Sequence, residues 1–313
     1  MKAAVRSRYG SPEVLTVKDI DPPTPKANEV LVRVYATTVN RSDYHVLIGK
    51  PFVMRFFTGF FYPTLAVTGS DFAGQVEATG SNAKRFKVGD KVMGFIDMGA
   101  KSHAQFLTIA ETKVTSMPRN VTYQQAVACL EGAFYALCAI QKIKPTAGQK
   151  ALVIGGTGAI GSSYVQFLNY YGVEVTAVCG VENNELVRSL GASRTIDYRT
   201  EDFTKSDDLY DFVLDAVGKS NFPKCKHLLK PSGIFSSSQP NFVNGLITSL
   251  KSGKKEVFAI PKDLMQNLDF IRDLVENGKF IPVIDREYSL EKIVDAYKYV
   301  ASGQKIGNVV ITL

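Results

Sequence analysis

The sequence has few of the residues from which metal sites and disulfide frameworks are built. It holds four cysteines and three histidines among 313 residues. No two cysteines are close together: they are Cys129, Cys138, Cys179 and Cys225. A metal knuckle needs tighter spacing, and a disulfide scaffold needs more cysteines. We therefore predict reduced and mostly buried thiols.

Long apolar runs are also missing. The longest candidate, residues 51–67, is interrupted by Arg55, Gly59 and Pro63, so it cannot cross a bilayer as one helix. The first six residues, MKAAVR, contain no apolar core of the kind found in secretion signals. On these grounds we expect a cytosolic protein with no membrane partner.

Charged residues make up 21% of the chain, and they give a net charge of +7 and a pI near 9.0. The basic residues are dispersed. Their densest cluster, which is Lys251, Lys254 and Lys255, has no aromatic residues around it on which bases could stack. We therefore expect no nucleic-acid partner, and a mild basic excess also suits an enzyme that binds a polyanionic cofactor.

The pattern of apolar residues changes along the chain. Residues 31–36 alternate as a half-buried strand does, and regular glycines separate further short runs, which indicates a compact barrel-like β domain. Thr122 can cap a helix. From residue 150 strand and helix alternate, which predicts a parallel doubly wound sheet. Its expected strands are 151–154, 173–178, 195–196, 212–214, 234–235 and 257–259.

The tail has a different character. Residues 264–275 carry apolar side chains at the spacing of a one-faced helix, and Gly278 ends it. A second helix at 290–301 and a closing strand at 308–313 follow. We expect this tail to complete the first domain. The predicted α/β architecture is a β-rich catalytic domain of residues 1–125 and 262–313, with an inserted dinucleotide-binding domain of residues 126–261.

A glycine loop follows the strand at 151–154 and opens a helix. It fits the pattern G-x-G-x-x-G, and that position gives the pattern meaning. The glycines allow a tight turn, approach of a diphosphate to the backbone, and close packing of helix on strand. Free N–H groups and the helix dipole then face the anion. The predicted cofactor-binding residues are Gly156, Thr157, Gly158, Ala159, Ile160 and Gly161.

The residues that would meet the adenosine ribose give conflicting signals. Gly180 follows the second strand and leaves room for a 2′-phosphate, whereas Glu182 would repel that phosphate if it pointed inward. Tyr198 and Arg199 follow the third strand and favour the phosphate. We predict NADP(H) as the preferred cofactor, with NAD(H) as the alternative.

With these residues in view, the chain resembles the quinone-oxidoreductase branch of the medium-chain dehydrogenase/reductase superfamily. The shared motifs are MKAAV at 1–5, VNRSDY at 39–44, GSDFAG at 69–74, VGDKVMG at 88–94, LGA at 190–192, IDY at 196–198 and GNVVI at 307–311. The resemblance implies a GroES-like catalytic domain, a Rossmann cofactor domain, an active site in the cleft between them, and a homodimer. It also assigns Asn308 to the cofactor.

The chain departs from the zinc alcohol dehydrogenases of this superfamily at the metal ligands. Those enzymes place a cysteine near the position of Asn40 and a His-Glu pair where this chain has Ser70 and Asp71. Cys129 lies close to the expected third ligand, but one thiolate does not hold zinc. We therefore predict that no metal is bound.

Without zinc, reduction of a conjugated substrate remains feasible, because conjugation already polarises the carbon that accepts the hydride. A hydrogen-bond donor can stabilise the developing oxyanion by about 3 kcal/mol. By the resemblance, Asn40 lies beside the nicotinamide and donates to the substrate oxygen or positions the ring. Tyr44 is the candidate second donor. Asp43 is expected to cap a helix or orient its neighbours.

The segment 52–62 holds six aromatic residues among eleven. One interpretation is an apolar lid over a flat hydrophobic acceptor, with Phe52, Phe56 and Tyr62 in contact with the substrate. The other is core or dimer-interface packing. The predicted activity is NAD(P)H-dependent reduction of a quinone or another small, apolar, conjugated carbonyl compound. The alternatives are an enoyl-thioester reductase and a cofactor-binding protein with little catalysis.

Overall fold

The structure is a computed structural model of the 313-residue chain, and it describes residues 1–97, 99, 101–238, 253–258 and 260–313. Lys251 of the basic cluster and Ala259 of a predicted strand lie outside the described residues. Contacts divide the chain into two compact units. Unit 1 is Met1–Glu131, Met265–Glu276 and Pro282–Leu313, and unit 2 is Gly132–Leu264 and Asn277–Ile281. The domain limits predicted from the sequence stay a proposal.

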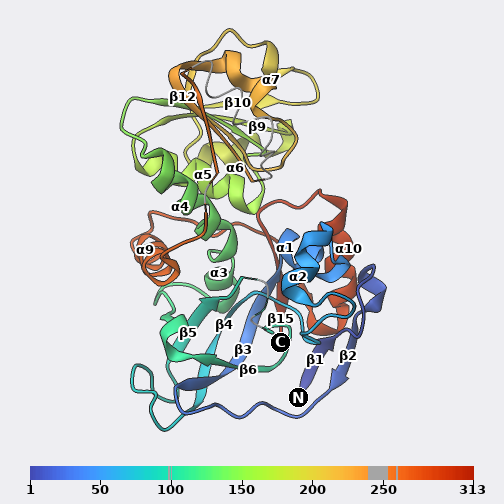
Figure 1. Cartoon of the computed structure of the whole chain (residues 1–313). Helices are drawn as coiled ribbons and strands as arrows, with labels where there is room; N and C mark the ends of the chain where they lie inside the picture. Colours follow the sequence, from blue (N-terminus) through green and yellow to red (C-terminus); the bar gives the residue numbers. More distant parts are fainter. Residues whose placement is uncertain (98, 100, 239–252, 259) are drawn as a thin grey trace. The chain divides into compact units, whose positions relative to one another are not determined.

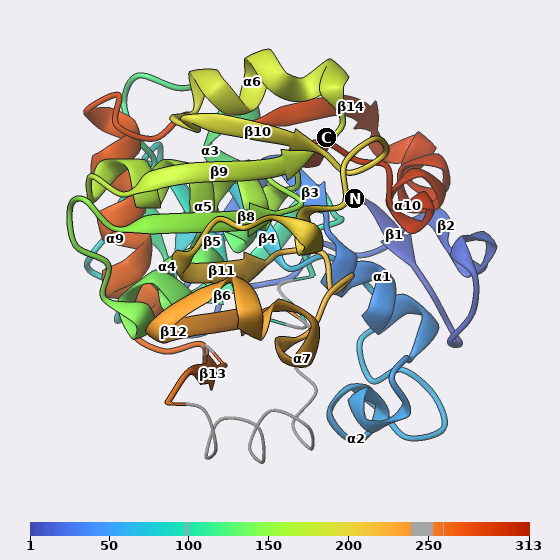
Figure 2. The same cartoon turned by 90° about the horizontal axis from the view of Figure 1, so that it is seen from above.

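Unit 2 is built on a six-stranded sheet in which all neighbouring strands are parallel. The strand order β10-β9-β8-β11-β12-β13, visible in Figure 2, is that of a doubly wound dinucleotide-binding fold. The predicted parallel sheet is therefore confirmed. Its strands are β8 (Lys150–Ile154), β9 (Glu174–Cys179), β10 (Arg194–Asp197), β11 (Tyr210–Asp215), β12 (Leu229–Ser237) and β13 (Lys255–Val257).

Helices connect these strands and bury their apolar faces. The central strand β8 is buried from Ala151 to Ile154, as expected for a parallel strand covered on both faces. The α-helices here are α4 (Glu131–Ile143), α5 (Ala159–Tyr170), α6 (Asn184–Ser189) and α7 (Phe222–Cys225). Short 3₁₀ turns are η4 (Val181–Asn183), η5 (Phe203–Lys205) and η6 (Lys226–Leu228).

Unit 1 contains a mostly antiparallel sheet along the path β14-β15-β3-β4-β5-β7, with β6 also paired to β3. The expected strand at 31–36 is the middle of β3, which spans Glu29–Val39. The other strands are β4 (Asp71–Thr79), β5 (Lys91–Phe95), β6 (Phe106–Ala110) and β7 (Thr115–Ser116). A separate antiparallel pair joins β1 (Lys2–Val5) to β2 (Thr16–Asp19).

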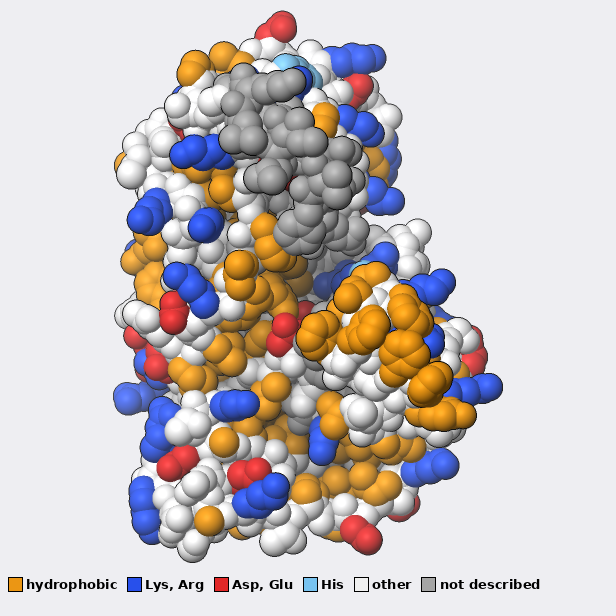
Figure 3. Space-filling view, in the orientation of Figure 1, with side chains coloured by type: hydrophobic (Ala, Val, Ile, Leu, Met, Phe, Trp, Pro, Cys, Tyr) orange, Lys and Arg blue, Asp and Glu red, His pale blue; other side chains and the backbone are white. Residues whose placement is uncertain are grey.

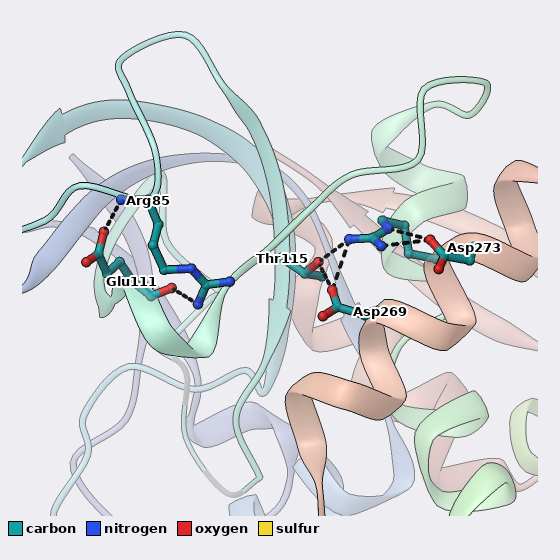
Figure 4. A network of polar contacts seen from close by, with 6 residues as sticks. Arg85, Glu111, Thr115, Asp269 and Asp273 are labelled. Carbon is teal, nitrogen blue, oxygen red and sulfur yellow. Dashed lines mark hydrogen bonds and ion pairs between the residues drawn. The ribbon is translucent and has the colours of Figure 1, made fainter.

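The tail belongs to unit 1. It contains α9 (Leu264–Glu276), β14 (Ile284–Ser289), η7 (Leu290–Lys292), α10 (Ile293–Ser302) and β15 (Asn308–Thr312). Strand β15 pairs antiparallel with β3 and parallel with β14, a strand that the sequence pattern did not reveal. Figure 4 shows how α9 is held: Asp269 accepts from Thr115 at 2.5 Å, and Arg272 contacts both side chains.

The remaining helices of unit 1 are short. They are η1 (Pro12–Val14), α1 (Arg41–Ile48), η2 (Phe52–Met54), α2 (Arg55–Thr58), η3 (Glu111–Lys113) and α3 (Tyr123–Val127) (Figure 1). The predicted cap is confirmed: Thr122 Oγ1 accepts from the Gln125 N–H at 3.2 Å, and Gln125 accepts from the Thr122 N–H at 3.0 Å. This reciprocal capping box explains where α3 begins.

One helical stretch among the described residues, Tyr123–Ile143, is long and apolar enough to cross a membrane by length and composition. The sequence analysis overlooked it in favour of residues 51–67. Within its most apolar window, 83% of the stretch is buried inside the structure. That burial is what a core helix of a globular fold displays.

Candidate functional site: a glycine loop and a buried polar network

The glycine loop connects β8 to α5 in unit 2, and it begins one residue earlier than the predicted motif. Gly155 has φ of +78°, a left-handed conformation that side chains rarely adopt. A Cβ atom at Gly161 would clash with the backbone of Gly155, so this glycine lets the first turn of α5 approach the loop. The loop shape is therefore set by glycines at both ends.

The N-terminus of α5 points its unpaired N–H groups at open space. Gly158 is the N-cap residue, and no side chain caps the helix. A Cβ at Gly158 would meet no atom closer than the Gly155 carbonyl oxygen, at 3.9 Å. The amides of Ala159, Ile160 and Gly161 lie in the first turn, where no carbonyl precedes them in the helix. An anion can bind here through the backbone and the helix dipole.

Two further loops lie at the same edge of the sheet. Gly180 follows β9, and Tyr198 follows β10. Strand β9 pairs parallel with β8, and β10 pairs parallel with β9, so the carboxyl ends of the three strands lie at one edge. The space expected above Gly180 is filled by an ion pair between Glu182 and Arg199. A Cβ at Gly180 would meet Glu182 Oε1 at 2.6 Å. In this structure these two side chains therefore take the room expected at Gly180, and the contact of Gly180 with the cofactor stays a prediction.

The ion pair brings together two residues whose signals about the coenzyme conflict in the sequence. The backbone N–H of Glu182 and the Arg199 guanidinium hold the pKa of Glu182 below its usual range, so the carboxylate stays ionised. Its charge is neutralised by Arg199, whose guanidinium also lies 5.4 Å from the centre of the Tyr198 ring. Arg199 presents a cation, and Tyr198 a ring that is 59% exposed, at this edge.

Sequence reasoning missed Asp215, which shapes the loop after β11. Its carboxylate is fully buried and accepts hydrogen bonds from the N–H groups of Val217, Gly218 and Ser220 at 2.8–3.0 Å. Val217 lies against Gly155, where a Cβ would clash with it. Asp215 therefore fixes the backbone of the loop whose Val217 side chain packs against Gly155. An acid at a strand end followed by small residues is the local signal that could have revealed it.

A second group of polar side chains is buried in unit 1 around Asn40. The carboxamide of Asn40 donates to Thr38 Oγ1 at 2.6 Å and to Asp71 Oδ2 at 3.2 Å. Thr38 in turn donates to Asp71 through both its hydroxyl and its backbone N–H. Both N–H groups of the Asn40 amide thus have acceptors already. The geometry fits a positioning residue better than the predicted donor to substrate, and its catalytic role stays a prediction.

The same group includes two more buried acids. Asp43 Oδ2 accepts from the Asn40 N–H at 2.8 Å, which caps α1 as expected. Glu131, from the start of α4, accepts from Ser42 and from Ser70, the latter at 3.3 Å. The set of Thr38, Asn40, Ser42, Asp43, Ser70, Asp71 and Glu131 is called the Asn40 network below. No sequence motif links Glu131 to the others, so the sequence analysis missed it.

Burial controls the charge of this network. It raises the pKa of Asp71 to about 6, although Thr38 and Asn40 donate to the carboxylate. Burial and the neighbouring acids raise the pKa of Asp43 and Glu131 as well. At neutral pH the network therefore retains protons on carboxyl groups. A cavity of about 20 Å³ beside Asp43 and Ser70 is too small for an organic substrate.

Tyr44 lies on α1, four residues after Asn40. Its ring is half-buried against the core of unit 1 and lies 5.8 Å from the Arg41 guanidinium. Among the described residues its hydroxyl forms no hydrogen bond, so it is available as a donor. His103, which matched no motif, is fully buried between Thr68 and Thr38. Burial lowers the pKa of His103 to about 4, so it is a neutral structural residue.

The residues at the zinc-ligand positions do not fit a zinc ion. Asn40 and Ser70 replace a thiolate and an imidazole, and Asp71 already accepts three hydrogen bonds. Burial raises the pKa of the Cys129 thiol to about 12, and its Sγ donates to Ala126 O at 3.0 Å. Within the described part of the chain, no group of three or more His, Cys, Asp or Glu side chains has the arrangement of a metal site.

Asn308 is buried at the start of β15. Its carboxamide donates to the carbonyl oxygens of Ala128 at 2.7 Å and of Val283 at 3.1 Å. The bond to Ala128 ties the tail to the rest of unit 1, and the bond to Val283 joins two parts of the tail. The predicted contact of Asn308 with the cofactor stays a prediction, and the contacts that the structure contains are structural.

The aromatic segment around α2 is exposed. Phe52, Phe56 and Tyr62 are 55%, 66% and 73% accessible to solvent. These three rings are therefore not packed in the core of this chain, and an apolar lid and dimer-interface packing both stay predictions. The rings form edge-to-face pairs with one another, for example Phe52 with Phe60 at 5.5 Å between ring centres.

These features define a class of protein. A doubly wound sheet with an open glycine loop, joined to a β-rich unit with a buried polar network, is the architecture of a dinucleotide-dependent dehydrogenase or reductase. Family models agree with this class. Residues 26–142 match the alcohol dehydrogenase GroES-like domain, and residues 190–311 match a family described as zinc-binding dehydrogenase.

Curated relatives cover nearly the whole chain. A 2-methylene-furan-3-one reductase of Solanum lycopersicum is 31% identical over 99% of this chain and 79% of its own length. A chloroplast envelope quinone oxidoreductase homolog of Arabidopsis thaliana is 32% identical over 92% of this chain and 91% of its own. The mitochondrial NAD(P)H oxidoreductase RTN4IP1 of Mus musculus is 30% identical over 100% and 89%.

Solved structures support the fold. The quinone oxidoreductase from Coxiella burnetii superposes with a TM-score of 0.90 at 24% identity, covering 100% of this chain and 99% of the other. The chain belongs to the quinone-oxidoreductase-like branch of the medium-chain dehydrogenase/reductase superfamily.

The relatives correct one expectation. We expected a cytosolic protein because the first residues contain no secretion-type apolar core. Relatives of this chain carry names that place them in the chloroplast or the mitochondrion. The cytosolic expectation is therefore wrong, because an address to these organelles does not depend on an apolar core.

Proposed function

We propose that this chain reduces small conjugated carbonyl compounds, quinones or enones, with NADPH as the preferred coenzyme and without zinc. The observation that carries the proposal is the open N-terminus of α5 at Gly158, at the same edge of the sheet as the Arg199 guanidinium near Gly180. The first feature suits a diphosphate and the second a 2′-phosphate. The names of the relatives, an enone reductase, a quinone oxidoreductase and an NAD(P)H oxidoreductase, favour the same chemistry.

The residues of this chain have separable roles in the proposal. The loop from Gly156 to Gly161 holds the diphosphate, and Gly180, Tyr198 and Arg199 meet the adenosine ribose. When bound, the reduced nicotinamide supplies a hydride to the acceptor. Tyr44 donates a hydrogen bond to the acceptor oxygen, and Asn40 keeps the local backbone in place through Thr38 and Asp71.

The acceptor would be recognised largely by apolar contact. Phe52, Phe56 and Tyr62 offer exposed aromatic faces on which a flat conjugated ring can stack. Conjugation matters because no metal cation would polarise the carbonyl group. The hydride then adds to a carbon whose negative charge is shared with oxygen, where one hydrogen bond suffices to stabilise it. The homodimer implied by the family resemblance stays a prediction.

Side-by-side turnover tests the proposal. NADPH oxidation is followed with a soluble quinone, a short enone and a crotonyl thioester. We expect turnover of the quinone or the enone, unchanged after dialysis against a chelator. Turnover of the thioester alone would indicate an enoyl-thioester reductase instead. Coenzyme binding without oxidation by any acceptor would indicate a binding protein, and activity lost on chelation and restored by zinc would contradict the metal-free mechanism.

A further inference from the structure

An exposed apolar surface lies over α1 and α2 in unit 1, and it extends beyond the three aromatic residues proposed above to contact the acceptor. In Figure 3 its side chains form one continuous hydrophobic area on the face in view. The members, called the aromatic patch below, are 43–78% exposed: Phe52, Val53, Phe56, Phe57, Phe60, Phe61 and Tyr62. Soluble monomers rarely expose so many large apolar residues side by side, so the patch indicates an interaction surface.

Specific contacts hold the segment that carries the aromatic patch in its conformation. Tyr9 Oη lies 2.8 Å from the hydroxyl of buried Thr58 and donates to the Gly59 carbonyl oxygen at 2.6 Å. The Arg55 guanidinium lies 4.6 Å from the centre of the Tyr9 ring and 5.5 Å from that of Phe52. Thr64 closes the loop by donating to the Thr58 carbonyl oxygen. These contacts fix the backbone of the segment while its rings remain exposed to solvent.

The charged residues within the segment that carries the patch are of one sign. Between Tyr44 and Ser70 the chain has no aspartate or glutamate, whereas it has Lys50 and Arg55. Lys50 is exposed, as is Arg8 beside the anchoring Tyr9. The chain as a whole carries a net charge of +7. Exposed aromatic rings in a segment whose charged residues are all cationic fit a membrane surface, where anionic headgroups cover an apolar interior.

We propose that the aromatic patch docks this protein on the surface of an anionic lipid bilayer. Phenyl rings would enter the boundary between headgroups and acyl chains, and Lys50 and Arg8 would meet the lipid phosphates. A symmetric contact between two copies of the patch is disfavoured, because it would bring like charges together with no acid in the segment to pair them.

The proposal revises the expectation of no membrane partner. That expectation rested on the interruption of residues 51–67, which concerns a spanning helix. Arg55, Gly59 and Pro63, which rule out such a helix, are the residues that fold this segment back on itself and expose its rings. The patch shares Phe52, Phe56 and Tyr62 with the proposed acceptor contact, so docking is tested at Phe57 and Phe61, which have no part in that contact, and in the absence of coenzyme; its failure is therefore distinguishable from failure of the proposed activity.

Vesicle binding tests the proposal. The full chain, without coenzyme, is floated with vesicles of phosphatidylcholine alone or with about a third phosphatidylserine, and the partition coefficient is measured. We expect binding to the anionic vesicles. The variant Phe57→Ser/Phe61→Ser should lower the partition coefficient at least tenfold, because its two side chains are 70% and 78% exposed. Val88→Ser, which removes another exposed apolar residue, is the matched control and should bind normally.

Two further measurements separate the contributions. Lys50→Gln should weaken binding to anionic vesicles about fivefold and leave neutral vesicles unaffected, whereas Lys26→Gln should change neither. The chain has no tryptophan, so Phe61→Trp introduces a single fluorophore. Its emission should shift to the blue on anionic vesicles and be quenched by brominated acyl chains.

Three outcomes would overturn the proposal. The wild-type chain does not float with anionic vesicles, or Phe57→Ser/Phe61→Ser floats as well as Val88→Ser, or the double variant converts a dimer to a monomer. The last result would assign the patch to a contact between copies. Unchanged thermal unfolding, with unchanged turnover of a water-soluble quinone, would establish that the double variant is folded.

Discussion

The glycine loop and the Asn40 network are built in opposite ways. The loop is one contiguous stretch, from Gly155 to Gly161, and it presents backbone N–H groups with no side chain in front of them. The network joins side chains from three separate segments, around residue 40, residue 70 and residue 131, and it uses their donors and acceptors on one another.

The difference teaches which part of the site binds and which part supports. A backbone site keeps its donors free for a ligand, because no carbonyl precedes the first turn of α5. The donors of Asn40 are already engaged, so the network supplies rigidity and retained protons rather than open hydrogen-bonding capacity. If this distinction is right, the loop is sensitive to an added charge and the network to a removed hydrogen bond.

The largest expected effect comes from a charge placed in the loop. Aspartate is a favoured N-cap residue, so Gly158→Asp should keep or raise the thermal stability of the chain. Its carboxylate would stand next to the diphosphate, and NADPH binding should fall at least a hundredfold. Gly158→Asn has the same shape without the charge and is the matched control. Equal dissociation constants for the two variants, from calorimetric titration, would contradict a backbone anion site.

The next effect concerns the unpaired hydroxyl beside the network. Tyr44→Phe should lower kcat roughly a hundredfold, which corresponds to the loss of one oxyanion donor. The dissociation constant of NADPH should stay the same. Tyr35→Phe, in which the removed hydroxyl belongs to a ring stacked on Tyr123 at 4.6 Å, is the control. A normal kcat for Tyr44→Phe would remove Tyr44 from the mechanism.

A third prediction tests the retained protons. The pKa of Glu131 is raised on folding, so the native state binds a proton that the unfolded state releases above its ordinary pKa of 4.5. The free energy of unfolding therefore falls as the pH rises from that value toward the native pKa. Glu131→Gln should remove this loss and gain roughly 2 kcal/mol relative to wild type between pH 5 and pH 7. Urea unfolding across this range measures it.

The control for Glu131 is Glu185→Gln, on the exposed face of α6. It should leave the pH dependence unchanged. Parallel stability curves for wild type and Glu131→Gln would mean that Glu131 is ionised in the folded chain. The network would then hold a negative charge, contrary to the assignment made from its burial.

The smallest effect concerns the choice of coenzyme. Arg199→Gln removes the cation and leaves Glu182 unpaired, so the ratio of kcat/KM for NADPH to that for NADH should fall about tenfold. Glu182→Lys should raise the same ratio. Arg188→Gln, on the exposed face of α6, serves as the control. A ratio that neither Arg199→Gln nor Glu182→Lys changes would mean that the ion pair lies away from the ribose.

The comparison also explains what the sequence could predict. The loop, the strands of the parallel sheet and the Thr122 cap depend on neighbours within a few residues, and all are visible as local patterns. Each partner of Asn40 beyond residue 43 is distant in sequence: Asp71 lies 31 residues away. Such contacts depend on how β3, β4 and α4 fold together, and no spacing rule reveals them.

Other contacts that the sequence did not reveal have the same origin. Gly180 was expected to open a space, but the side chains of Glu182 and Arg199 pair above it, a contact across 17 residues. For Asn308, whose contact with the coenzyme stays a prediction, the sequence did not reveal that the carboxamide donates to Ala128 and Val283. The sequence motifs drew attention to Gly180 and Asn308 themselves. Their partners were set by the tertiary fold.

The central claim is that the chain binds a nicotinamide coenzyme through the glycine loop. Its most direct test is a calorimetric titration of the purified wild-type chain with NADPH and, separately, with NADH. If the backbone N–H groups at the start of α5 form the coenzyme site, both titrations saturate and NADPH binds more tightly. If the chain is folded and neither coenzyme gives a heat of binding at any concentration, the result would contradict a backbone coenzyme site at α5.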